Sequence, residues 1–204
     1  MLNFCSLYSG STGNCLFAQS EKTNILIDAG VSTRKIENAL SQINICPESI
    51  SGILITHEHS DHIQSVGTFS KKYNIPVYTN IETWNAISED QKEKISLENH
   101  KTFIIDENFD IGDLKVSAFS IPHDAANPCG FNITSKNSKI SVATDLGHMT
   151  PEILENLKNS SFVLLESNYE PEVLRYSKYP YVLKKRIDGP TRSSFKHNGR
   201  SNRS

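Results

Sequence analysis

The 204-residue chain has no long apolar run, no cysteine pairs and no internal repeat. A helix that crosses a membrane needs about 18 or more consecutive apolar residues, so we expect no membrane span. The N-terminal segment MLNFCSLYSGSTGN lacks a basic region followed by an apolar one, and we therefore expect no signal peptide. The scattered cysteines Cys5, Cys15, Cys46 and Cys129 form no Cys-x-x-Cys pair, which favours reduced, mostly buried thiols and a cytoplasmic protein over a disulfide framework.

The formal charge of the whole chain is only −2, but it is unevenly distributed. The segment from Lys184 to the end carries seven basic residues and one acid, and the body before it carries −8. A basic end can bind nucleic acid. Residues 189–204, however, contain one large apolar residue, Phe195, and bury too little surface to offset the entropy of ordering. We expect a disordered basic tail at 189–204 and one domain over residues 1–188.

Short apolar runs alternate with amphipathic stretches along the body, which predicts a layered α/β fold. Helices are expected over residues 32–42 and 63–73. A third helix should begin at Thr150-Pro151, where Thr caps the helix and Pro occupies its first position. Strands are expected at residues 24–28, 53–56, 76–78, 103–105, 114–119, 130–133, 139–143 and 162–165.

Four of these predicted strands end in a polar or ionisable residue, namely Asp28, His57, Asp145 and Glu166. In layered α/β folds, strand ends and the loops that follow them carry the chemistry. The pattern therefore predicts that several polar side chains converge on one edge of the fold.

The stretch THEHSDH, residues 56–62, holds three of the seven histidines. His57 and His59 are one residue apart in extended chain, so both side chains point to the same side and suit one divalent metal. Asp61 and His62 come where the next helix begins and can face a second point nearby. Two such points about 3.5–4 Å apart make a two-metal hydrolytic centre. The alternative is a polar loop of solvated histidines, which is less consistent with an apolar strand leading into the cluster; Glu58 should point away from its neighbours, to an outer position or the surface.

Further ligands are needed to complete two metal sites. His123 and Asp145 each follow a predicted strand, and Pro122 stiffens the approach to His123. Either residue alone would be an ordinary surface group, but beside the histidine cluster both are candidate ligands. His100 and His148 lack such a setting and are expected not to bind metal. A set of imidazoles and carboxylates without thiolates favours Zn, Mn or Fe over Ca.

The motifs SGSTGNC, THEHSDH, HDAANPCGF, ATDLGHM and LLESNY resemble the YycJ/WalJ-type family of the metallo-β-lactamase fold superfamily. The resemblance runs from about Asn3 to about Gly189. It implies a four-layer αββα sandwich with two metals at the edge of its two sheets. It also implies a DNA exonuclease that acts from 5′ to 3′.

The resemblance also implies roles for individual residues. His57, His59 and His123 would hold the first metal, and Asp61 and His62 the second. Asp145 would bridge both metals, and Asp28 would orient groups around them by hydrogen bonds.

The C-terminal end departs from this family. The family continues through a Leu-Ser-Asn segment to a final histidine ligand of the second metal, whereas this chain ends in GPTRSSFKHNGRSNRS. His197 has no apolar strand before it and is not assigned as that ligand. We therefore expect a sandwich that is incomplete at its C-terminal edge and a second metal that lacks one ligand; a truncated or frameshifted gene end is our hypothesis.

Two metals would share a water whose pKa falls toward neutrality, and the resulting bridging hydroxide would attack phosphorus. Asp61 is the expected catalytic residue, since it can orient that hydroxide. In the turn Ser9–Asn14, the residues Ser9, Ser11 and Asn14 either bind a phosphate or simply form a tight turn. Ser167 and Asn168 either line the cleft or cap a following helix.

Two other functions remain open. The first is a small-molecule hydrolase for thioesters or lactams; the lack of a basic patch in the body weakly favours it, and the turn at 9–14 weakly opposes it. The second is an inactive, truncated protein that still binds metal. DNA is the expected substrate, and no oligomeric state is predicted.

Overall fold

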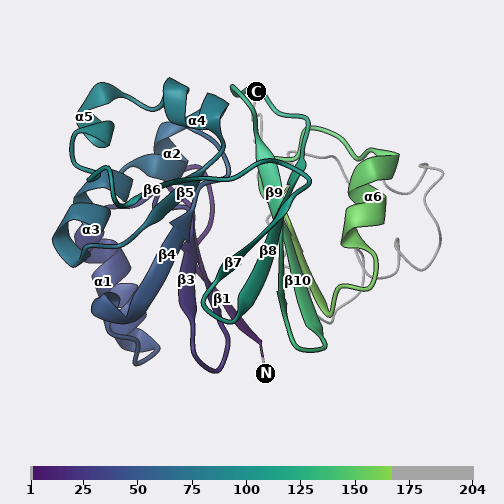
Figure 1. The fold of residues 1–204 in the computed structure, drawn as a ribbon, viewed down its shortest axis with the longest axis horizontal. Coiled ribbons are helices and arrows are strands. Elements are labelled where there is room, and N and C mark those ends of the chain that lie inside the picture. Colours follow the sequence, from purple (N-terminus) through teal and green to yellow (C-terminus); the bar gives the residue numbers. More distant parts are fainter. Residues whose placement is uncertain (1, 167–204) are drawn as a thin grey trace, which may run out of the picture.

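The computed structural model describes residues 2–166, which form two β-sheets packed face to face with helices on both outer faces (Figure 1). This is the four-layer αββα sandwich that the resemblance implies. The predicted tail at 189–204, the residues Ser167 and Asn168, and the C-terminal edge of the sandwich lie outside the described residues. Within residues 2–166, no helix has the length and apolar character needed to cross a membrane.

The first sheet has six strands whose order in space follows their order in the chain. Its first three strands are antiparallel, and its third to sixth strands are parallel, so these four end at the same edge. The strands are β1 (Asn3–Tyr8), β2 (Cys15–Gln19), β3 (Asn24–Ile27), β4 (Ile50–Leu54), β5 (Val77–Thr79) and β6 (His100–Thr102).

Short helices between these strands cover the outer face of the first sheet (Figure 1). The largest, α1, turns Ile36, Ala39 and Leu40 inward at helical spacing, which is why the sequence predicted it. The helices are α1 (Thr33–Gln42), a 3-10 helix (Pro47–Ser49), α2 (Ser60–Ile63), α3 (Val66–Tyr73), α4 (Ile81–Ala86) and α5 (Glu89–Lys92).

The helix expected over residues 63–73 is broken, which corrects the prediction. The chain instead forms α2 and α3, separated at Gln64 and Ser65. The backbone N–H of Ser65 donates to the carbonyl of Ala29, and its hydroxyl donates to the carbonyl of Val31 at 2.6 Å. These bonds to the loop after β3 replace the helical bond that Ser65 would otherwise make, so α2 ends after one turn.

The second sheet has the order β11-β10-β9-β8-β7 and is antiparallel except for the parallel pair β10 and β11. Helix α6 (Pro151–Leu157) connects that parallel pair and covers the outer face of this sheet (Figure 1). As predicted, α6 begins with Pro151, and the Thr150 hydroxyl accepts the N–H of Ile153. The strands are β7 (Asn108–Ile111), β8 (Leu114–Ser120), β9 (Cys129–Ser135), β10 (Ser138–Ala143) and β11 (Phe162–Leu165).

The strand expected at residues 103–105 lies three residues earlier, as β6. Residues 100–102 pair with β5, and the last bond of this ladder runs from the N–H of Phe103 to the carbonyl of Thr79. After Thr79, the segment that follows β5 enters α4, so residues 104 and 105 have no strand to pair with. The apolar run misled the prediction because Phe103 is buried between the sheets as a core residue.

The core lies in two main layers that follow the alternation of side chains along the strands. Ile25 and Ile27 of β3 point into the space between the sheets, whereas Leu26 points toward the helices. The space between the sheets is filled from both sides, with Phe131 of β9 at 0% exposure and in edge contact with Phe103. This packing fixes the two sheets, and hence their edges, relative to each other.

The four cysteines are all unpaired, as expected. Cys15 and Cys129 are buried, but Cys5 is only half-buried and Cys46 is exposed. Burial is therefore less complete than the sequence predicted.

Replacing Phe131 by Ala should lower the free energy of unfolding by about 3–5 kcal/mol, because a fully buried aromatic side chain is lost and leaves a cavity between the sheets. Urea unfolding followed by circular dichroism measures this change. Leu97→Ala is the matched control, since Leu97 is 93% exposed and should be nearly neutral. Equal stability of the two variants would contradict this account of the core.

Candidate metal centre

The ends of β3, β4 and β10 bring Asp28, His57 and Asp145 to one edge of the sandwich. The N–H of Asp28 donates to Leu54 at the end of β4, and His57 Nε2 lies 3.8 Å from Asp145 Oδ2. Asp28 and Asp145 both have positive φ, 61° and 54°, a conformation that Asp tolerates better than most residues. The chain thus turns sharply at each strand end and leaves the carboxylate at the edge.

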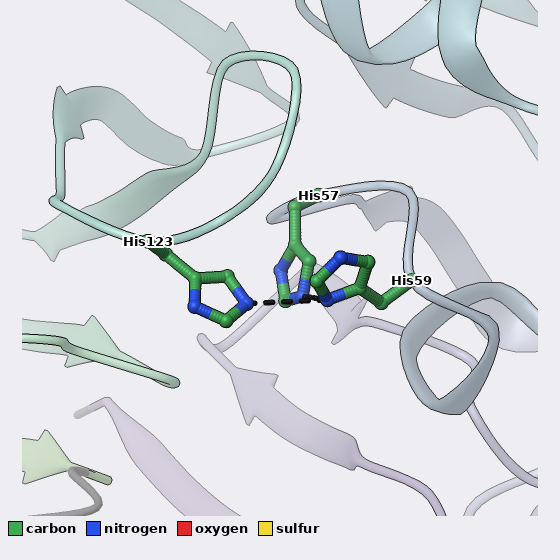
Figure 2. A group of neighbouring side chains, drawn as sticks. All are labelled: His57, His59 and His123. Atoms are coloured by element: carbon green, nitrogen blue, oxygen red, sulfur yellow. Dashed lines mark hydrogen bonds between the residues drawn. The ribbon is translucent and has the colours of Figure 1, made fainter.

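Three histidines form one compact group at this edge (Figure 2). His59 Nδ1 lies 3.1 Å from His57 Nε2 and 3.2 Å from His123 Nε2. The three nitrogen atoms all lie within 4.8 Å of one another. Figure 2 shows that His57 and His59 come from one segment and that His123 reaches them from a separate loop. The donor set and its spacing suit a divalent metal such as zinc.

A second group of ligand atoms adjoins the first and shares His57 with it. His62 Nε2 lies 2.7 Å from Asp145 Oδ2, and His57, His62 and Asp145 form a second set within 4.8 Å. Asp61 Oδ2 lies 3.8 Å from His62 Nε2, with the Asp61 side chain 36% exposed. Asp145 thus belongs to the second group, and its Oδ2 lies 3.8 Å from Nε2 of the shared His57.

Asp28 is completely buried and accepts three hydrogen bonds. Its Oδ1 accepts the backbone N–H of Thr56, and its Oδ2 accepts both the Thr56 hydroxyl and His62 Nδ1, at 2.8 and 2.7 Å. Because Nδ1 of His62 donates to this carboxylate, Nε2 is the nitrogen left to face the centre. Asp28 thus fixes the orientation of His62.

The charges around His62 decide its protonation. Burial alone would lower the pKa of His62, but the negative charges and hydrogen bonds of Asp28 and Asp145 raise the pKa to about 10. Burial disfavours the charged form of Asp145 and so raises its pKa. The hydrogen bond and positive charge of His62 have the larger combined effect with its neighbours and hold the pKa of Asp145 below its usual value. Without metal, His62 is therefore positively charged at neutral pH. It lies between two carboxylates, which favour a cation at this place.

His57 is held in the opposite state. Burial, and then the positive charge of His62, lower the pKa of His57 to about 2, so its imidazole is neutral at pH 7. Its Nδ1 lies 3.0 Å from the Thr56 hydroxyl, which already donates its hydrogen to Asp28 and therefore accepts from His57. His57 Nε2 thus keeps a free lone pair directed toward both groups of ligand atoms.

The turn Ser9–Asn14 packs directly against the centre through Asn14. Asn14 Nδ2 lies 2.9 Å from His62 Nε2, and the Asn14 backbone N–H donates to the carbonyl of Asp61. Gly30 lies at the same junction, where an added Cβ would come 1.6 Å from the Asp61 carbonyl oxygen. Only a residue without a side chain fits there.

The other residues of this turn are further from the metal ligands. The Ser9 hydroxyl donates to the Glu166 carboxylate at 3.3 Å, and Ser11 is exposed. The backbone N–H of Gly10 donates to the Asn14 side chain, and that of Gly13 to the Gly10 carbonyl. Two backbone N–H groups of the turn thus donate within the turn, and that of Asn14 donates to Asp61, which favours a tight turn over an anion nest formed by these three amides.

Neither His100 nor His148 belongs to either group of ligand atoms in the described part of the chain. His100 stacks on Trp84 with ring centroids 3.6 Å apart, and His148 is exposed. Ser167, Asn168 and His197 lie outside the described residues.

Sequence reasoning missed the role of one residue at the centre. Thr56 was assigned only to a strand, yet β4 ends at Leu54 and the Thr56 hydroxyl links Asp28 to His57. A hydroxyl directly before a buried histidine is a detectable signal.

Glu58 lies at the outer of the two positions expected for it. One of its carboxylate oxygens is buried, and the other accepts the backbone N–H of Ala126 in the loop that carries His123. The sequence did not predict this partner, because it is 68 residues away.

Comparison with known proteins identifies the family. The family model of the beta-lactamase superfamily domain matches residues 23–181. The chain is 38% identical over 193 residues to "Exodeoxyribonuclease YycJ" of Bacillus anthracis, covering 91% of this chain and 70% of that protein. It is 35% identical over 182 residues to "Exodeoxyribonuclease WalJ" of Streptococcus pneumoniae, covering 89% of this chain and 68% of that protein.

Solved structures share the fold at much lower identity. Zinc-bound PqqB from Methylobacterium extorquens superposes with a TM-score of 0.68 at 16% identity, over 80% of this chain and 64% of that one. The metallo-β-lactamase fold protein YhfI from Bacillus subtilis gives a TM-score of 0.67 at 14% identity, over 83% of this chain and 72% of that one. The chain therefore belongs to the beta-lactamase superfamily and, within it, to the YycJ/WalJ-like family.

Proposed function

We propose that this protein is a metal-dependent hydrolase that cleaves phosphodiester bonds, acting as a 5′–3′ exonuclease on DNA. The observation that carries the proposal is the pair of adjoining ligand groups that share His57, with the Asp145 carboxylate of the second group 3.8 Å from His57 and 2.7 Å from His62. The two relatives called exodeoxyribonucleases support DNA as the substrate.

The ligand atoms fit two divalent ions. In this proposal His57, His59 and His123 hold the first ion, Asp61 and His62 hold the second, and Asp145 contacts both. The set contains imidazoles and carboxylates without thiolates, so zinc, manganese or iron fits it. Such ions, when bound, would lower the pKa of a water and offset negative charge on a phosphate.

The protein's own groups then have separate tasks. The Asp61 carboxylate is partly exposed beside His62 Nε2, where it can accept a hydrogen bond from the attacking water and orient it; this makes Asp61 the proposed catalytic residue. Asp28 keeps Nε2 of His62 directed at the centre. Asn14, whose side chain lies 2.9 Å from His62 Nε2, is the proposed substrate contact nearest the centre.

The remaining substrate contacts are proposed more broadly. A phosphate beside the 9–14 turn would contact the side chains of Ser9 and Ser11, since the backbone amides of Gly10, Gly13 and Asn14 already have partners. Ser167 and Asn168 remain proposed cleft residues outside the described part of the chain.

We further propose one catalytic domain over residues 1–188, followed by the basic tail at 189–204. The four unpaired cysteines are consistent with a reducing compartment, and we propose the cytoplasm.

His59→Ala should abolish degradation of 5′-ended DNA in the presence of Mn²⁺ or Zn²⁺, because the His59 imidazole contacts both other histidines of the first group. Release of nucleotides from 5′-labelled DNA measures this. His148→Ala is the matched control, since it removes an exposed histidine outside both groups and should retain activity. A wild-type protein that hydrolyses a thioester or lactam but leaves DNA intact would overturn the proposed substrate.

Elemental analysis of the purified full chain should give two divalent ions per chain. Dialysis against a chelator should remove both the ions and the nuclease activity, and added Mn²⁺ or Zn²⁺ should restore activity. Fewer than two ions, together with no activity, would instead favour an inactive metal-binding protein.

A further inference from the structure

Glu58 lies in the chain between His57 and His59 of the three-histidine group, but its side chain belongs to neither group of ligand atoms and binds a backbone N–H instead. Its Oε1 accepts the backbone N–H of Ala126 at 2.7 Å. Its Oε2 is buried and has no hydrogen-bond partner among the described residues. A buried carboxylate oxygen without a partner is unfavourable, so an ordinary surface glutamate would not be expected to adopt this position. The burial of Glu58 points to a structural role for its side chain.

Ala126 belongs to the loop that carries His123. This loop, residues 121–128, joins β8 to β9 and has no regular secondary structure. The position of His123 is therefore set by bonds that tether the loop. Figure 2 shows His123 extending from this loop toward the other two rings.

The loop is tethered at three points. The Pro122 carbonyl accepts the N–H of Gly147 at 2.9 Å, and the Asn127 carbonyl accepts the side-chain amide of Asn80 at 2.8 Å. These two bonds attach the loop to the segment after β10 and to the start of α4. The bond from Ala126 to Glu58 attaches it to the segment that holds His57 and His59.

Side chains alternate in direction along the extended segment 57–59, so this segment can both present histidines to the centre and bind the backbone of the loop 121–128. His57 and His59 point to one side and contact His123 through their rings. Glu58, between them, points to the other side and binds the backbone three residues after His123. The loop is therefore bound by both faces of the same segment.

We infer that Glu58 is a positioning residue that sets the distance between His123 and the His57/His59 pair by accepting the N–H of Ala126. This inference rests on the proposed metal centre. The role requires an acceptor oxygen at the end of a side chain of this length, and it does not require negative charge. Glu58→Gln should therefore preserve the bond, whereas Glu58→Asp and Glu58→Ala should break it.

The first test is the affinity of the full chain for Zn²⁺, measured by competition with a chromophoric chelator. Outer partners of metal ligands typically contribute about 10–100-fold to metal affinity, so Glu58→Ala should weaken binding by about that factor. Glu58→Asp should also weaken binding, and Glu58→Gln should bind like wild type. Glu155→Ala, which removes an exposed glutamate on α6, is the control and should be unchanged.

The contrast between Asp and Gln keeps the test decisive even if Glu58→Ala does not fold. If Gln weakens binding and Asp does not, charge matters and the inference is wrong. If all three variants bind like wild type, the metal centre stands and the role of Glu58 is wrong. If wild-type protein binds no Zn²⁺, the proposed centre itself fails.

A second test separates positioning from general stability. In a His123→Ala background, Glu58→Ala should cause no further loss of Zn²⁺ affinity, because Glu58 acts through His123. A full additional loss would contradict the inference. In the metal-free protein, hydrogen exchange at the Ala126 amide should be faster in Glu58→Ala and Glu58→Asp than in wild type and Glu58→Gln; equal exchange in all four proteins would also overturn it.

Discussion

The buried carboxylate of Asp28 is the group on which the arrangement of the centre depends. It joins the end of β3 to the segment after β4 through two bonds from Thr56, and to α2 through His62. Taking a carboxylate out of water costs on the order of several kcal/mol unless hydrogen bonds or opposite charge compensate. Here the compensating groups are the ones that must be oriented, so the burial of one anion fixes both Thr56 and His62.

The contacts that begin at Asp28 also explain why His57 and His62 differ in protonation. In the metal-free protein, His62, placed between Asp28 and Asp145, is held in the charged form, whereas His57, beside His62 and away from solvent, is held neutral. Two imidazoles five residues apart in the chain thus have opposite protonation states. Their difference arises from which of them touches a carboxylate closely.

Much of this could be predicted from the sequence, because the signals were local. The apolar strands, the polar residues at their ends and the spacing of His57, His59, Asp61 and His62 are all readable within a few residues. The proposed ligands His123 and Asp145 needed only the assumption that strand ends meet. The assignment of each ligand to a particular ion stays a prediction.

The parts that could not be predicted depend on contacts between distant segments. The break between α2 and α3 arises because Ser65 binds carbonyls more than thirty residues earlier in the chain. Residues 103–105 form no strand because β5 has already ended, which the apolar run itself cannot reveal. The bond from Glu58 to Ala126 likewise depends on how the loop 121–128 crosses the edge of the sandwich.

The two sheets contribute to the centre unequally but jointly. His57, His59, Asp61 and His62 follow the first sheet, whereas His123 and Asp145 follow strands of the second. Ions held there would bind both halves of the sandwich at once and would have no comparable site in the unfolded chain. By mass action, a ligand at one hundred times its dissociation constant that binds only the folded state adds about 2.7 kcal/mol to its stability. The metal supply of the cell would then shift the folding equilibrium of the protein toward the folded state.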